Sequence, residues 1–173
     1  MNVMKRNILF VILSLPIFCF ACTSHDFDKK KFENVNHAAH AVRDSVKAGA
    51  DIQQFGNLLQ ELSAEISVLK DKVKSEKERE LLKDYSDLLA IYRDGLTLWK
   101  YKTEFTQYGF VPKSLIYVGQ DVEPIVEKYR LKTESHIFKP TKQSWKSIPE
   151  NSIHIIWMNA DSQLKIINNI LNY

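Results

Sequence analysis

The chain has little cysteine: only Cys19 and Cys22 among 173 residues, both near the N-terminus. The rest of the chain cannot form an internal disulfide, so its stability must come from a hydrophobic core. Glycine is also scarce, and its five residues lie too far apart to form a phosphate-binding loop. The part that follows Cys22, about 150 residues, is long enough for one hydrophobic core and too short for two full domains.

An excess of charge of one sign is missing as well. The chain has 24 basic and 21 acidic residues, a formal net charge of +3, and the two signs are interspersed. Nucleic-acid-binding proteins usually carry a one-signed basic surface, so we expect no nucleic-acid partner. The local exception is Lys29-Lys30-Lys31. We interpret it as the solvated end of a tether, with contact to anionic lipid headgroups as the alternative.

Motifs for catalysis and metal binding are absent too. The sequence contains no Glu-x-x-His pair, no Cys-x-x-Cys-His haem attachment site and no Gly-x-Ser-x-Gly elbow. His37, His40 and Asp44 share one face of a predicted helix and could hold a divalent ion weakly. That face points away from the apolar stripe, which favours solvated polar residues. The sequence therefore predicts a protein that is not an enzyme and has no cofactor and no metal site.

The single long apolar run lies at the start of the chain. Residues 8–20 are apolar except for Ser14 and Pro16, and they follow Lys5 and Arg6. The run is too short to span a bilayer as a helix, and it ends at the small residue Ala21. This pattern predicts that residues 1–21 are a signal peptide and that the protein is exported.

The segment Cys19-Phe20-Ala21-Cys22 resembles the lipobox of bacterial lipoproteins, in which a small residue precedes the cysteine that becomes the lipidated N-terminus. The resemblance implies that Cys22 carries a lipid anchor and that the membrane is one partner of the protein. Thr23 implies, by likeness to enterobacterial sorting, the outer membrane facing the periplasm. Ordinary cleavage after Ala21 is the alternative. Residues 22–31 would form the lipidated N-terminus and a tether that reaches about 30 Å when extended.

Apolar residues recur at alternating steps of three and four over residues 32–49, 52–73, 82–99 and 153–171. Each set lies on one stripe of a helix that must pack against another helix. Gly49 is a predicted C-cap, and Asp51 and Ser75 are predicted N-caps. We therefore predict an all-α fold, an antiparallel bundle of about four main helices in one domain, residues 32–173. Residues 52–99 could instead form one long rod, but the heptad phase breaks between Val73 and Leu82.

Regular spacing fails between about residues 108 and 148, where we expect an irregular crossover segment with one short helix at residues 121–131. Aromatic residues gather in or beside this segment. They either cover the bundle end or are exposed together as a partner or ligand surface. These candidate surface residues are Phe105, Tyr108, Phe110, Tyr117 and Trp145.

In its signal and helical pattern the chain resembles small bacterial envelope lipoproteins with helical ectodomains. The leading expectation is a non-enzymatic, membrane-tethered binding or scaffold module for another envelope component, a protein partner. One alternative is a small-ligand-binding periplasmic protein with a pocket at the bundle end, lined by polar groups such as Tyr108, Tyr117 or Lys113. The other is a self-associating structural protein that uses a spare apolar face of Leu58, Leu81, Leu88 and Ile91.

Overall fold

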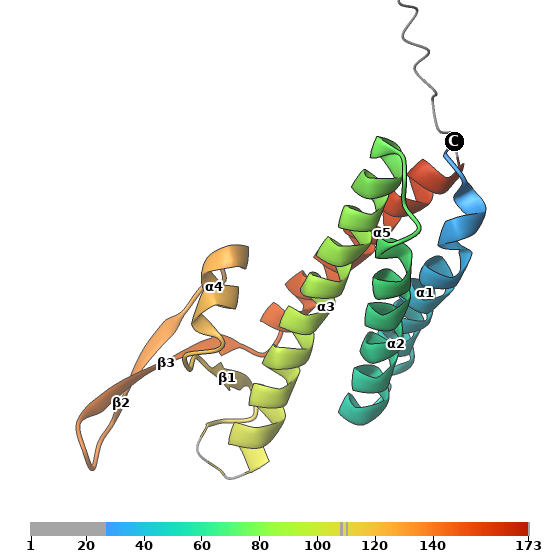
Figure 1. The fold of residues 1–173 in the computed structure, drawn as a ribbon. Helices are drawn as coiled ribbons and strands as arrows, with labels where there is room; N and C mark the ends of the chain where they lie inside the picture. Colours follow the sequence, from blue (N-terminus) through green and yellow to red (C-terminus); the bar gives the residue numbers. More distant parts are fainter. Residues whose placement is uncertain (1–26, 108, 110, 173) are drawn as a thin grey trace, which may run out of the picture.

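The computed structural model of the chain describes residues 27–107, 109 and 111–172. After a short 3-10 helix, η1 (Lys29–Phe32), four long helices pack together: α1 (Glu33–Ala48), α2 (Ile52–Lys70), α3 (Glu76–Gln107) and α5 (Ser152–Asn172). Helices α1, α2 and α3 alternate in direction, and α5 runs along α3 (Figure 1). The prediction of a mostly helical chain is confirmed.

The helix ends form as their residue types predict. Gly49 caps α1 in the left-handed conformation, with φ of 70°. The carboxylate of Asp51 accepts a hydrogen bond from the backbone N–H of Gln54 at 2.8 Å and so caps α2. Helix α2 ends at Lys70 and α3 begins at Glu76, so the two form a hairpin rather than one rod.

The prediction of an all-α fold is wrong. Residues 115–149 contain a three-stranded antiparallel sheet of β1 (Leu115–Tyr117), β2 (Glu134–Phe138) and β3 (Gln143–Pro149), in the order β1-β3-β2. The crossover segment is therefore not irregular throughout. No residue of β2 is buried, so the strand lacks the apolar alternation that reveals a half-buried strand in a sequence.

The short helix expected at residues 121–131 is present as α4 (Glu123–Tyr129), with Pro124 in its first turn. Its N-cap residue is Val122, which makes no capping hydrogen bond through its side chain. An aspartate at the first position of the expected helix could cap it, but Asp121 instead accepts a hydrogen bond from the hydroxyl of Tyr101 on α3 at 3.0 Å. The tertiary contact with α3 therefore replaces the local cap.

Two clusters of buried residues form the core. The first fills the bundle around Phe32, Phe55 and Tyr85. The second lies among α3, α4, α5 and the sheet, and contains Leu98, Ile116, Val122, Ile125, Ile148 and Ile156. Trp157 of α5 packs against both clusters. It can do so because Gly95 of α3 has no side chain: a Cβ there would lie 2.2 Å from the indole ring.

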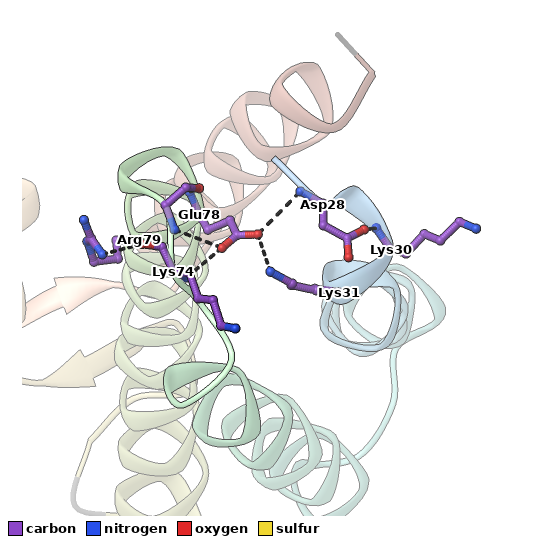
Figure 2. A network of polar contacts seen from close by, with 7 residues as sticks. Asp28, Lys30, Lys31, Lys74, Glu78 and Arg79 are labelled. Carbon is purple, nitrogen blue, oxygen red and sulfur yellow. Dashed lines mark hydrogen bonds and ion pairs between the residues drawn. The ribbon is translucent and has the colours of Figure 1, made fainter. Parts of the chain in front are cut away.

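Glu78 joins three parts of the chain (Figure 2). Its carboxylate accepts hydrogen bonds from the backbone N–H groups of Lys74 (2.7 Å), Ser75 (3.1 Å) and Asp28 (3.4 Å). The ammonium group of Lys31, a residue of the expected tether, lies 2.7 Å from the same carboxylate. Glu78 therefore helps to cap α3 beside Ser75, its predicted N-cap, and also holds the start of the folded chain against the α2–α3 turn.

Within the part of the chain that the structure describes, no helix has the length and apolar composition needed to cross a membrane.

We expect Gly95→Ala to lower the free energy of unfolding by about 1–3 kcal/mol, because the new methyl group would overlap the Trp157 ring, which neighbouring aromatic rings hold in place. Gly56→Ala is the matched control, since nothing lies within 4 Å of a Cβ built in that α2 position. The control should gain up to about 1 kcal/mol from helix propensity. Urea unfolding measures both, and equal effects of the two substitutions would contradict the close packing.

We expect Glu78→Gln to cost about 1.5–3 kcal/mol at neutral pH, because it removes a buried carboxylate that accepts several hydrogen bonds. Burial opposes ionisation of Glu78, but the Lys31 ammonium and the three backbone N–H groups outweigh it and lower the pKa from 4.5 to about 2.

A carboxyl group with a lowered pKa stabilises the fold fully above its ordinary pKa and loses that contribution as the pH falls. The stability difference between the wild-type protein and Glu78→Gln should therefore shrink between pH 4.5 and pH 2. Urea unfolding across this range measures it, with the exposed Glu80→Gln as the control. A difference that stays constant with pH would show that the charge of Glu78 contributes nothing.

Candidate ligand cleft and aromatic surface

A cleft of about 630 Å³ opens between one end of the helical bundle and the sheet. The C-terminal end of α1, the C-terminal third of α3, the end of β3 and the first turns of α5 all contribute to its walls. Most of the lining is apolar, and it comes from both core clusters. Its lining includes Val46, Trp99, Lys102, Ser114, Pro149, Glu150, Ile153 and Trp157.

The two tryptophans of the cleft are held from behind by Phe55, whose side chain is fully buried. The ring centroid of Phe55 lies 5.9 Å from that of Trp99 and 5.6 Å from that of Trp157. Trp157 also packs against Tyr92, at 6.3 Å between centroids. These contacts fix the indole rings, so the apolar wall of the cleft is preformed.

One ion pair supplies the charge of the cleft. The ammonium group of Lys102 bonds the carboxylate of Glu150, and both side chains remain partly exposed. The backbone of Glu150 is fixed as well: its N–H donates to the carbonyl of Ser114 at 2.8 Å, and its carbonyl accepts from the N–H of Ile153 at 3.2 Å. The cleft therefore presents a positive and a negative group side by side at a set position.

A smaller cavity of about 330 Å³ adjoins the cleft and shares Val46 and Trp157 with it. Tyr92 lines this second cavity and is 1% exposed. Its buried hydroxyl group has no hydrogen-bond partner among the described residues. A buried polar group without a partner is costly, so this hydroxyl is a hydrogen-bonding position that a bound molecule could use.

A row of aromatic side chains crosses from α3 over the sheet. Ring centroids are 4.9 Å apart for Phe105 and Tyr117, and 6.3 Å apart for Tyr117 and Trp145. Tyr101 stacks on Phe105 at 5.3 Å, and His136 stacks on Trp145 at 4.2 Å. The row thus joins α3, β1, β3 and β2 by continuous contacts, which the antiparallel register permits.

Polar contacts fix both ends of this row. His136 Nε2 and the hydroxyl of the buried Ser147 lie 2.8 Å apart. At the other end, burial and the hydrogen bond to Asp121 raise the pKa of Tyr101. Gly119 leaves room between Tyr101 and Tyr117, because a Cβ there would lie 3.0 Å from each ring.

Three of the five predicted surface residues come together in this row: Phe105, Tyr117 and Trp145. Tyr108, Phe110 and the predicted lipidation site Cys22 lie outside the described residues. Sequence reasoning missed Tyr101, although its position four residues before Phe105 places both on one helix face. It also missed His136, which meets Trp145 only because β2 and β3 pair.

The polar groups of the cleft also differ from those expected. Tyr117 belongs to the aromatic row, and neither it nor Lys113 lines the cleft as the described residues form it. Lys102 and Glu150 take their place. The sequence separates these two residues by 48 positions, and nothing in it indicates that they pair.

The His37, His40 and Asp44 group does not gather around a common point. His40 Nε2 lies 3.2 Å from the side-chain oxygen of Asn168 on α5, and the carboxylate of Asp44 bonds Arg43. Among residues 27–107, 109 and 111–172, no group of three or more His, Cys, Asp or Glu side chains has a geometry that could hold a metal ion.

Comparison with protein-family models, with curated proteins and with solved structures finds no match to this chain, so its site has to be interpreted from its own chemistry.

Proposed function

We propose that this protein is an exported, lipid-anchored binding protein of the bacterial envelope that holds a small, mainly apolar molecule without catalysing a reaction. The observation that carries the proposal is the cleft beside Trp99 and Trp157. Its volume of about 630 Å³ falls within the usual range for small-molecule sites, roughly 300–1,000 Å³.

The chemistry of the cleft supports binding and limits the kind of molecule. The indole rings and aliphatic side chains favour an apolar body, while the Lys102–Glu150 pair favours one polar group on the ligand. These two charges bond each other, so they serve recognition better than proton transfer. The hydroxyl of Tyr92 offers a further hydrogen bond.

The mainly apolar lining of the cleft supports the small-ligand interpretation more than the protein-scaffold interpretation. Self-association through a spare helix face has less support. Leu81 and Leu88 are fully buried, and Leu58 and Ile91 pack against the core, so the bundle itself uses this apolar surface. A protein partner remains the second candidate function, supported by the exposed apolar residues Ile137 and Phe138.

The lipid anchor and the outer-membrane, periplasm-facing location rest on the sequence of residues 1–23. The fold agrees with such a tether in one respect. The folded chain begins beside the α2–α3 turn, at the bundle end opposite to the one that forms the cleft (Figure 1). A membrane anchor at Cys22 would therefore leave the cleft facing away from the membrane.

We expect Cys22→Ser to abolish incorporation of radiolabelled palmitate when the full-length chain is expressed in a bacterium that exports lipoproteins. Cys19→Leu is the matched control, because it removes the other cysteine of the chain and keeps an apolar residue at the first position of the lipobox-like segment, so labelling should be preserved. Mass spectrometry of the mature protein should show an acylated Cys22. An unlabelled wild-type protein with an N-terminus at Cys22 would instead support ordinary signal-peptidase cleavage.

We expect the apolar fluorophore N-phenyl-1-naphthylamine to bind the exported protein saturably, at one site per chain. Because the chain has three tryptophans, Trp145→Phe leaves Trp99 and Trp157 of the cleft as the only reporters. Energy transfer from them to the fluorophore would locate the binding. Native mass spectrometry of the protein purified without denaturation should also reveal a bound natural ligand as added mass.

Ser114→Phe should fill the mouth of the cleft and weaken fluorophore binding about tenfold, equivalent to about 1.4 kcal/mol. Ser162→Phe places the same bulk on an exposed position of α5 outside the cleft and should leave binding unchanged. Equal affinities of the two variants, or fluorophore binding that does not saturate, would contradict a ligand site in this cleft.

A further inference from the structure

The outer edge of the sheet is open. In the strand order β1-β3-β2, strand β2 pairs with β3 on one side and with no other strand in the described part of the chain. Its five residues contain no proline, and their backbone N–H and C=O groups on the free side are available for pairing. An extended segment of another chain can add to such an edge as a further strand.

Two exposed apolar side chains lie on this edge strand. Ile137 is 68% exposed and Phe138 is 53% exposed. Because they are consecutive in a strand, they lie on opposite faces of the sheet. A strand that pairs along β2 would meet one of them on each face, whereas a flat membrane surface could cover only one face of the sheet.

The β2–β3 hairpin and the residues that lead into it from α4 carry an excess of positive charge. Residues 128–146 contain six basic residues and one acidic residue, Glu134. Lys128 and Lys146 pair with Asp94 and Glu123. The other four are exposed, and none of them forms an ion pair within the described residues: Arg130, Lys132, Lys139 and Lys142.

This charge decides between the candidate occupants of the edge. Pairing with a second copy of the chain would bring the two sets of unpaired basic residues together, and like charges disfavour that contact. An acidic segment would neutralise them and would speed its own association.

We propose that β2 is a docking edge for an extended acidic segment of a partner protein. The segment adds as a fourth strand beside β2, places apolar side chains against Ile137 and Phe138, and directs carboxylates toward Lys139 and Lys142 at the end of the hairpin. The hairpin projects from the bundle away from the end where the folded chain begins (Figure 1). The edge is separate from the ligand cleft, since none of these four residues lines it.

The test uses a fluorescein-labelled peptide in which two consecutive valines, whose side chains lie on opposite faces of a strand, are flanked by glutamates. It is titrated against the exported protein and followed by fluorescence anisotropy. We expect saturable binding that weakens with added salt, since exposed charges contribute to it. The same peptide with all of its backbone nitrogens methylated has no N–H group to donate to an edge strand and should not bind. Binding of the methylated peptide with unchanged affinity would overturn strand addition.

Charge reversal gives the sharper test. Lys139→Glu with Lys142→Glu should weaken binding of the glutamate peptide about tenfold and create binding of a lysine–valine peptide. The matched control, Lys70→Glu with Lys83→Glu, changes the same charge on exposed positions of α2 and α3 and should leave both affinities unchanged. Equal effects of the two double variants would show that net charge alone attracts the peptide, which would overturn the proposal.

Ile137→Ser with Phe138→Ser should likewise weaken peptide binding, whereas Met158→Ser, on an equally exposed position of α5, should not.

Flotation with vesicles of phosphatidylcholine and phosphatidylglycerol tests the membrane alternative. Because the hairpin variants share their N-terminus with the wild-type protein, a difference in flotation reports the hairpin alone. Vesicle binding that depends on Lys139 and Lys142, without peptide binding, would assign the edge to a lipid surface and overturn the proposal. Fluorophore binding in the cleft is expected to survive all these substitutions, so failure here leaves the proposed function untouched.

Discussion

The contact between Gly95 and Trp157 is the constraint on which the arrangement of both cores depends. Glycine in the middle of a helix costs about 1 kcal/mol relative to alanine, so its place in α3 needs a compensating contact. The indole of Trp157 supplies one by lying directly over the glycine and packing against both clusters of buried residues. The same ring forms part of the cleft wall. Core packing and the candidate site therefore share a single side chain.

Glu78 imposes a second constraint at the opposite end of the bundle. Its carboxylate binds the start of α3, the turn before it and the first folded residues of the chain. A buried carboxylate is tolerable only because these donors satisfy it. The result is a firm connection where a tether would enter the fold. A protein held at this end by an anchor presents its cleft and its β2–β3 hairpin at other parts of its surface.

The two proposed sites differ in their physical basis. The cleft is concave and preformed by packed aromatic rings, which suits a small molecule. The β2 edge offers backbone hydrogen bonds, two exposed apolar side chains and unpaired positive charge, which suits an extended acidic chain. No residue named for the edge lines the cleft, so the two can act independently or together in one binding protein.

The sequence by itself determined the helices, their caps at Gly49, Asp51 and Ser75, and the short helix after Asp121, because periodicity and capping act within a few residues. The sequence also indicated a candidate aromatic surface that includes Phe105, Tyr117 and Trp145. Only the tertiary structure decided the sheet, the stacking of His136 on Trp145 and the pairing of Lys102 with Glu150. These features join residues that are far apart in the chain, so no local pattern can predict them. Strand β2 also has no buried residue, so its sequence lacks the alternation of apolar residues that would indicate a strand.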